Sequence, residues 1–307
     1  MSQPQKGICA EPNLHAQYLF YNVLDDDGQA VRAKLARVLD IFAHFDDEHY
    51  EAMVSGVIAI GSDYFSELYP GLRPIELSPF PDMQCGERCA PSQTADVFIQ
   101  IRADRQDIVY AIATEVHELL RLHVELVDDV KGFRYLDGRD LNGFVETDDN
   151  PRGLEKVRAA IIGDEDPDFA GGSYIHTQKY RHDLRRWALL SERHQEQIIG
   201  RTKAHNLPST EANASSHYIR SRNADDVCNN NHYQLLRQSM PYADMHVQGL
   251  LQVTCSASTK PFKTMLHSMI FGGPDEEYDA WLDYTNAETG GAYFAPAVTF
   301  LKQRAQS

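Results

Sequence analysis

Long apolar runs are missing from this sequence of 307 residues. No stretch approaches the roughly 18 consecutive apolar residues that a membrane-spanning helix needs. Residues 1–9 also lack the apolar core of a secretory signal peptide. We therefore expect a cytoplasmic protein with no membrane segment and no membrane partner.

Basic residues are scarce relative to acidic ones. Lys and Arg number 29 and Asp and Glu number 45, which gives a formal net charge of −16. A surface this acidic repels phosphate backbones and anionic lipids. The charge therefore argues against a nucleic-acid partner, and it says nothing about the fold.

Cysteine is sparse as well. The five cysteines form no dense framework, so we expect the reduced thiols of an intracellular protein. Cys85 and Cys89 make a single CxxxC pair, whereas a structural zinc site usually needs four ligands. We expect this pair to lie in a loop, with a redox or metal role as the less favoured alternative.

The signature motifs of several enzyme classes are absent. The sequence contains no P-loop, no G-x-S-x-G motif and no dinucleotide-binding fingerprint. A zinc protease of the H-E-x-x-H type needs two histidines four residues apart on one helix face. His117-Glu118 is followed next by His123, which does not fit that spacing.

What the sequence does contain is a ferredoxin-like order of strands and helices in its first half. Apolar spacing from Val31 to Phe42 and from Ile108 to Leu120 predicts two amphipathic helices. Alternating or β-branched runs predict four strands, at His15–Leu24, Val57–Ile60, Val97–Arg102 and Val124–Val130. The resulting β-α-β, β-α-β order packs helices on one face of an antiparallel sheet.

The second half offers the same kinds of element after an acidic, turn-rich break at residues 163–172. The patterns predict strands at 173–181 and 246–254, a helix at 187–200, and a further helix that begins at Thr259. Residues 202–233 are different, because they are rich in Asn, Ser and His and have no clear period. A long irregular segment inside a compact domain is often functional.

Short motifs occur in a fixed order along the chain, at 140–145 with 150–153, 171–174, 196–203, 216–217, 235–242, 249–251 and 290–296. Together they resemble the segments of the dye-decolourising peroxidase family, most strongly from 132 to 296. The resemblance implies an α+β fold of two ferredoxin-like halves with antiparallel sheets and a barrel-like body. It divides the chain into residues 1–153 and 154–307, with haem in the second half.

The same resemblance implies a haem b cofactor with His217 as the axial ligand of the iron, since haem iron takes a neutral imidazole on one face. Arg237 would be the distal arginine, because a guanidinium stays ionised when buried and can stabilise charge that develops on peroxide. Arg220 would meet a haem propionate. Ser239 stands where the family often has Asn near the arginine.

The stretch that normally reads G-x-x-D-G is Gly143-Phe-Val-Glu146-Thr147 in this chain. Glu146 keeps a carboxylate that can relay a proton above the iron, although it has one more methylene than Asp. Asp148 stands nearby and could present its carboxylate instead. These departures concern peroxide chemistry rather than haem binding.

The axial imidazole should also donate its second N–H to an acceptor. Asp225, Asp226 and His232 lie between His217 and Arg237, and the sequence does not choose among them.

The implied function is an H2O2-dependent peroxidase that oxidises an organic reductant, either dye-like or phenolic. A haem-binding protein for storage, delivery or sensing, with weak peroxidase activity, is the alternative that the altered G-x-x-D-G stretch suggests. The resemblance also implies a homodimer or a higher homo-oligomer.

Overall fold

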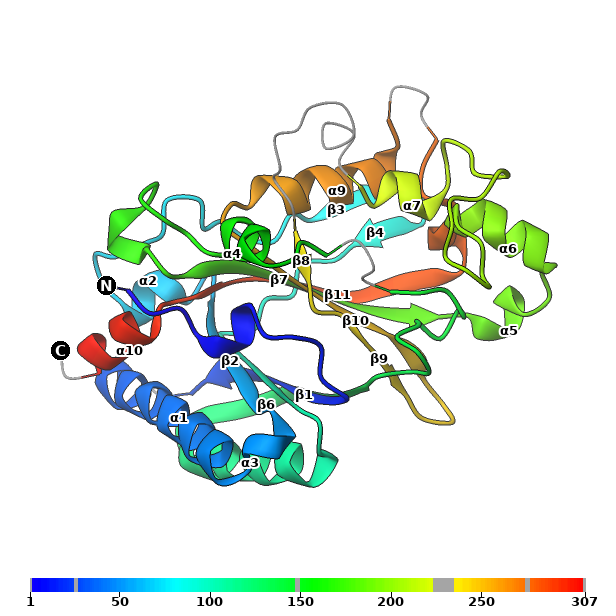
Figure 1. The fold of residues 1–307 in the computed structure, drawn as a ribbon. Coiled ribbons are helices and arrows are strands. Elements are labelled where there is room, and N and C mark those ends of the chain that lie inside the picture. The colour runs from blue at the N-terminus through cyan, green and yellow to red at the C-terminus, as the bar shows by residue number, and fades with distance from the viewer. Residues whose placement is uncertain (1, 25–26, 147–149, 223–234, 274–276, 306–307) are drawn as a thin grey trace.

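Two helix-covered parts share one large sheet in this computed structural model, which describes residues 2–24, 27–146, 150–222, 235–273 and 277–305 (Figure 1). Helices α1 (Gly28–Glu48) and α3 (Gln106–Leu120) lie on one side of the strands, and α9 (Lys260–Phe271) lies on the other. Among the described residues, no helix is long and apolar enough to cross a membrane.

The first half contains the expected ferredoxin-like unit. Its strands are β1 (His15–Val23), β2 (Ser55–Gly61), β5 (Val97–Ala103) and β6 (Val124–Phe133). They pair antiparallel in the order β2-β5-β1-β6, with α1 and α3 as the two connecting helices. The fold expected from the β-α-β, β-α-β order is therefore confirmed for this half.

The apolar stripes found in the sequence form the core between these helices and the sheet. Val31, Leu35 and Val38 of α1 are buried, as are Ile112 and Val116 of α3. Burial of one such side chain contributes about 1.5–3 kcal/mol. Asp27 caps the start of α1, since its side chain accepts a hydrogen bond from the Ala30 amide at 3.0 Å.

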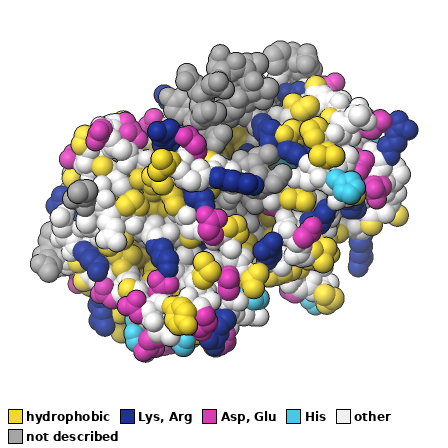
Figure 2. Space-filling view, in the orientation of Figure 1, with side chains coloured by type: hydrophobic (Ala, Val, Ile, Leu, Met, Phe, Trp, Pro, Cys, Tyr) yellow, Lys and Arg dark blue, Asp and Glu magenta, His cyan; other side chains and the backbone are white. Residues whose placement is uncertain are grey.

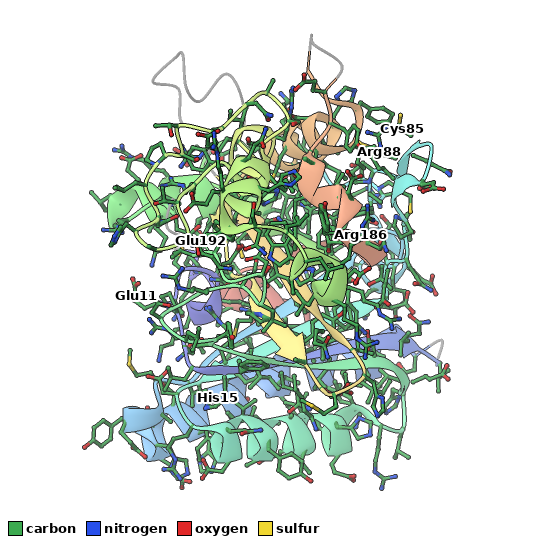
Figure 3. The ribbon with its side chains drawn as sticks, turned by 90° about the vertical axis from the view of Figure 1, so that its right-hand side faces the viewer. Glu11, His15, Cys85, Arg88, Arg186 and Glu192 are labelled. Atoms are coloured by element: carbon green, nitrogen blue, oxygen red, sulfur yellow. The ribbon has the colours of Figure 1, made fainter. Side chains whose placement is uncertain are left out.

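An insertion between β2 and β5 carries the CxxxC pair. It contains α2 (Phe65–Leu68) and a hairpin of β3 (Met83–Cys85) and β4 (Arg88–Ala90). The pair thus lies on a small hairpin rather than in the expected irregular loop. Cys85 and Arg88 lie side by side there (Figure 3), and Nη2 of Arg88 is 3.3 Å from Sγ of Cys85. Cys9, Cys85, Cys89 and Cys255 are free thiols.

The second half repeats the ferredoxin-like order. Its strands are β7 (Ser173–His182), β8 (Leu236–Arg237), β9 (Met240–Ala243), β10 (Gln248–Ser256) and β11 (Thr285–Ala295). They pair antiparallel, with β7 between β11 and β10 and with β9 and β8 beyond β10. The helices α4 (Leu154–Ala160) and α10 (Val298–Arg304) complete this part of the chain. The boundary expected at 153/154 stays a prediction.

The helix expected at 187–200 is two shorter helices, α5 (Leu184–Trp187) and α6 (Glu192–Ile199). Ser191 separates them, because its side chain accepts a hydrogen bond from the His194 amide and so begins a new helix. Apolar periodicity alone did not reveal this cap.

The two halves join along their edges into a nine-stranded sheet. Tyr293 and Phe294 of β11 pair with β2, and Gly132 of β6 pairs with Tyr242 of β9. Strand β7 also pairs with β10, but the β6–β9 joint is a single residue pair. The barrel-like body that the family resemblance led us to expect is therefore not confirmed.

Candidate functional site

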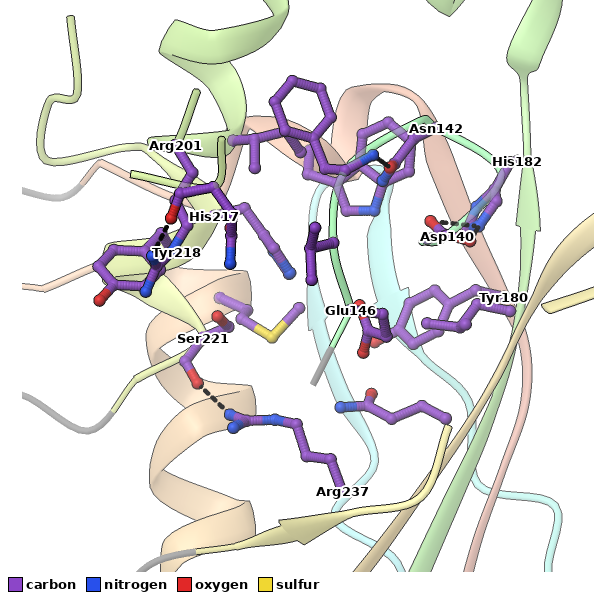
Figure 4. Close-up of a pocket in the computed structure, with 18 residues that line it drawn as sticks. Asp140, Asn142, Glu146, Tyr180, His182, Arg201, His217, Tyr218, Ser221 and Arg237 are labelled. Carbon is purple, nitrogen blue, oxygen red and sulfur yellow. Dashed lines mark hydrogen bonds and ion pairs between the residues drawn. The ribbon is translucent and has the colours of Figure 1, made fainter. Parts of the chain in front are cut away.

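A pocket opens in the second half between the segment 140–146, helix α7 (His217–Arg220), strand β8 and the short helix η4 (Ala280–Asp283). Figure 4 shows its side chains converging from these elements. The polar and ionisable residues of its lining are Asp140, Asn142, Glu146, Tyr180, His182, Arg201, Asn206, His217, Tyr218, Ser221, Arg237 and Gln252. The pocket therefore gathers residues that are far apart in the sequence.

His217 is the first residue of α7, and the turn before it is held firmly. The Ser216 hydroxyl donates to the Gln197 carbonyl at 2.6 Å. Helix α6 ends nearby at Gly200, which has φ +87°. A Cβ at that position would lie 2.9 Å from Cβ of Ser216, so glycine permits this close approach. Part of the segment 202–233 lies outside the described residues, but residues 202–216 contain no helix or strand.

The acceptor for the His217 imidazole is Asp279. Nδ1 of His217 lies 2.6 Å from Oδ2 of Asp279, which is fully buried. The other oxygen of Asp279 accepts from the Trp281 amide at 3.0 Å, which fixes the carboxylate. The candidates from the sequence (Asp225, Asp226 and His232) lie outside the described residues.

Asp279 controls which ring nitrogen of His217 faces the pocket. Burial is the largest single influence on the pKa of His217 and lowers it, but the charge and hydrogen bond of Asp279 outweigh burial, so the pKa is raised. Because Nδ1 is engaged by the carboxylate, Nε2 is the nitrogen left to bind a group in the pocket. Figure 4 shows the ring directed inward.

Arg237 reaches the same pocket from β8, where it pairs with Thr254 of β10. Nη2 donates to the Ser221 carbonyl at 2.6 Å and lies 3.4 Å from Sδ of Met265. These contacts direct the guanidinium across the pocket (Figure 4).

Glu146 is the carboxylate that lines the pocket beside Arg237. Desolvation raises the pKa of Glu146 to about 7, and the nearby charge of Asp140 adds to the rise, while His217 and Arg237 oppose it. A carboxyl group with a pKa near neutrality can both accept and release a proton. Asp148, the alternative donor of a carboxylate, lies outside the described residues.

His182 and Asp140 form a buried polar pair in the wall of the pocket. Nε2 of His182 lies 3.2 Å from Asp140, and Nδ1 lies 2.7 Å from the Thr285 hydroxyl. The His182 ring also packs on Trp281. Asp140 belongs to the family-like motif at 140–145, but nothing in the sequence linked it to His182, which lies 42 residues away.

Of the five site residues predicted from the sequence, three line this pocket, namely Glu146, His217 and Arg237. The other two lie outside its lining. Arg220 is buried against Gly273, where an added Cβ would lie 2.6 Å from Nη1. Ser239 borders a neighbouring cavity. A haem contact of Arg220 or Ser239 stays a prediction without support from this geometry.

Arg201 also lines the pocket. It belongs to the family-like motif at 196–203, but the sequence did not predict it as a site residue. Its guanidinium stacks on the Tyr218 ring at 3.9 Å from the centroid, next to His217. Nη1 donates to the Asn206 carbonyl at 2.6 Å. A cation held at this place can pair with an acidic group of a bound cofactor.

The donor set fits haem. Among the described residues, no group of three or more His, Cys, Asp or Glu side chains could hold a bare metal ion. One open imidazole suits a metal that brings its own equatorial ligands, as haem iron does. Apolar side chains such as Ile199, Leu250 and Met269 provide surface for a macrocycle.

Comparisons with known proteins agree with this geometry. The models described as "Dyp-type peroxidase, N-terminal" and "Dyp-type peroxidase, C-terminal" match residues 5–134 and 137–300. A dye-decolorizing peroxidase of Mycolicibacterium paratuberculosis is 35% identical over 304 residues, which cover 97% of this chain and 85% of that protein.

Solved structures are similar over nearly the whole chain. A putative dyp-type peroxidase protein from Shewanella oneidensis has a TM-score of 0.95 and 41% identity, with 99% of each chain covered. A variant of DypB from Rhodococcus jostii RHA1 in complex with heme has a TM-score of 0.90 and 29% identity, over 95% of this chain and 96% of that one. The chain thus belongs to the dye-decolourising peroxidase family of haem-dependent peroxidases.

Proposed function

We propose that the protein holds haem b through Nε2 of His217 and reduces H2O2 with electrons from phenolic or dye-like organic donors. The observation that carries this proposal is that one pocket is lined by a carboxylate-anchored imidazole, a guanidinium and a carboxyl group. The solved heme complex of the DypB variant from R. jostii RHA1 supports the cofactor. Haem, when bound, supplies the iron at which peroxide binds and is reduced.

Glu146 would move the proton. Its carboxylate accepts a proton from one oxygen of H2O2 and returns it to the other oxygen, which then leaves as water. The pKa of about 7 suits this task, because the group is neither a strong acid nor a strong base at neutral pH.

Arg237 would stabilise the negative charge that develops on the leaving oxygen while the O–O bond breaks. Its contacts with Ser221 and Met265 hold the guanidinium before peroxide enters, so little reorganisation is needed. Over a full cycle, H2O2 gains two electrons and two protons to give two waters. Two molecules of a phenolic donor each lose one electron and one proton.

The remaining parts of the proposal are a cytoplasmic location and assembly as a homodimer or a higher homo-oligomer. They follow from the resemblance and from the composition of the sequence. The alternative, a haem protein for storage, delivery or sensing with weak peroxidase activity, finds no specific support, and the proposed proton relay by Glu146 would have no role in storage.

An absorption spectrum of the purified protein tests the proposal, before and after stoichiometric H2O2. We expect a ferric Soret band that changes on addition of peroxide, together with turnover of a phenolic donor. Arg237→Ala should lower peroxide turnover by about 10²-fold or more, as the loss of a charge-stabilising donor does. Arg158→Ala is the matched control, because that arginine is exposed and pairs with Glu155 on α4. Unchanged turnover in Arg237→Ala would refute the assigned role.

A further inference from the structure

A second cavity, of about 410 Å³, adjoins the haem pocket. Arg237 lines both spaces, so one residue of β8 separates them. The lining of the second cavity comes from the N-terminal segment, from β5, from residues 150–156 and from residues 236–240. Its size lies within the range of sites for small organic ligands.

Arg102 of β5 lines this cavity, and one of its hydrogen-bond donors has no partner. The residue is only 3% exposed. Nη2 donates to the Gly7 carbonyl at 3.1 Å, whereas Nε has no hydrogen-bond partner. A buried guanidinium stays charged, and leaving one of its donors unpaired is costly. An acceptor from a bound molecule would remove that cost.

Ser239 lines the same cavity and carries a second unsatisfied group. Its hydroxyl oxygen is buried and has no hydrogen-bond partner. Arg102 and Ser239 come from different halves of the fold, so the cavity gathers two separate donors that an anion with two oxygens could engage.

The electrostatics of the cavity favour an anion. Its described lining contains Arg102, Arg152, Lys156 and Arg237 against a single acid, Glu11, which pairs with Lys156 at 2.6 Å. The whole chain has the opposite balance, 29 basic against 45 acidic residues. On the face that Figure 2 shows, basic and acidic side chains lie intermixed. The basic lining is therefore a local property that would attract an anion.

The lining also contains the amides Asn150 and Gln238 and several apolar side chains. Pro12, Pro151, Leu236 and Met240 contribute carbon surface beside the two donors. Such a lining suits a flat hydrocarbon group attached to the anionic one, since small-ligand sites combine apolar walls with a few placed polar groups.

We propose that this cavity binds a small aromatic carboxylic acid, with the carboxylate on Arg102 and Ser239 and the ring against Leu236 and Met240, and that a phenolic acid bound there is a reducing substrate. The second clause rests on the proposed function. In that role each bound phenolic acid loses one electron and its phenolic proton, and two such molecules reduce one H2O2 to two waters. The phenolic acid would then be separated from the haem pocket by Arg237, which lines both spaces.

Calorimetric titration of the haem-loaded protein tests the binding, with 4-hydroxybenzoate and its neutral analogue 4-hydroxybenzamide as probes. We expect 4-hydroxybenzoate to bind at least about tenfold more tightly, the effect of one charge-assisted hydrogen bond. Ser239→Ala should reduce that preference several-fold, and Arg102→Met should abolish it. Because Arg102 is a core residue, Arg152→Glu at the exposed rim provides an independent variant that should also weaken 4-hydroxybenzoate alone. Arg158→Ala is the control outside the cavity.

Equal affinity for the two probes would overturn the proposal, as would an unchanged preference in both Ser239→Ala and Arg152→Glu. Competition by inorganic phosphate at the same concentration as 4-hydroxybenzoate would likewise overturn it, because the ring would then contribute nothing.

Peroxide turnover with the neutral probe tests the proposed function separately. Turnover without a carboxylate preference would overturn the inference and leave the proposed function standing. Carboxylate binding without any turnover would overturn the proposed function and, with it, the substrate role of the bound acid, but not the binding site.

Discussion

Asn150 holds the backbone of Arg237 from both directions. Its side-chain Nδ2 donates to the Arg237 carbonyl at 2.6 Å, and its Oδ1 accepts from the Arg237 amide at 2.8 Å. One amide side chain thus acts as a strand partner for β8, which is only two residues long. It also ties the segment that follows Glu146 to the strand that carries Arg237.

Replacement of Asn150 should therefore make the position of the Arg237 backbone, and with it the guanidinium, less well fixed. In Asn150→Ala both backbone groups of Arg237 lose their partner, and each such loss costs about 1–3 kcal/mol if the group stays buried. We expect a lower free energy of unfolding and slower peroxide turnover with an unchanged Soret position. Denaturant unfolding and stopped-flow kinetics measure the two effects.

Asn150→Asp separates the two hydrogen bonds, because the carboxylate keeps the acceptor for the Arg237 amide but cannot donate to the carbonyl. Its losses should fall between those of the wild type and those of Asn150→Ala. If Asn150→Ala retained wild-type stability and turnover, the positioning role would be wrong.

Glu146 makes stability depend on pH. Its pKa in the folded protein is about 7, above its ordinary value of 4.5, so the folded state binds more protons than the unfolded state between these values. The protonated Glu146 therefore makes its full contribution to the free energy of unfolding below about pH 4.5. That contribution is lost as the pH rises to 7. In the haem-free wild type, the free energy of unfolding should fall by on the order of 2–3 kcal/mol across that window. In Glu146→Gln this fall should be absent. Denaturant unfolding between pH 5 and pH 7.5 measures it.

Asp140 offers a check on that cause. Its charge adds to the raised pKa of Glu146, so Asp140→Asn should shrink the pH dependence. Asp137→Asn is the control, since Asp137 is exposed and pairs with Arg139. Identical pH profiles for the wild type and Glu146→Gln would contradict the assignment.

Asp279 should tune the haem through His217. A partner that orients a ligating histidine typically accounts for about 10–100-fold in affinity or activity. Asp279→Asn keeps an acceptor of similar shape and removes the charge. We therefore expect weaker haem retention and a more positive reduction potential, measured by spectroelectrochemistry. Asp283→Asn is the comparison, because Asp283 is the last residue of η4, at the end opposite the Asp279 cap, and is exposed. Equal potentials in the two variants would argue against the role of Asp279.

Much of the fold could be predicted because local patterns encode it. The stripe from Val31 to Phe42 and the alternation from Val97 to Arg102 are direct consequences of helix and strand periodicity. The break between α5 and α6 was missed, because it depends on the single cap at Ser191. The joint of Gly132 with Tyr242 connects two halves of the chain and leaves no local trace in either.

The site was predictable only in part. His217, Arg237 and Glu146 were found through the order of family-like motifs, since a lone histidine in an irregular segment has no periodic signal. Asp279 was missed because it lies 62 residues from His217 and is brought there by the packing of η4 against α6 and by the hydrogen bond from its amide to the Met269 carbonyl of α9. Unpaired groups such as Nε of Arg102 are likewise a property of three-dimensional packing.

The most direct test of the account is the absorption spectrum of His217→Ala beside that of the wild type, with both proteins loaded with the same haem. We predict that the wild type shows a ferric Soret band of a histidine-ligated haem. The variant should lose that band, and added imidazole should restore it by filling the space left by the side chain. A variant with the wild-type spectrum in the absence of imidazole would contradict the assignment of His217 as the ligand, and with it the architecture proposed for the site.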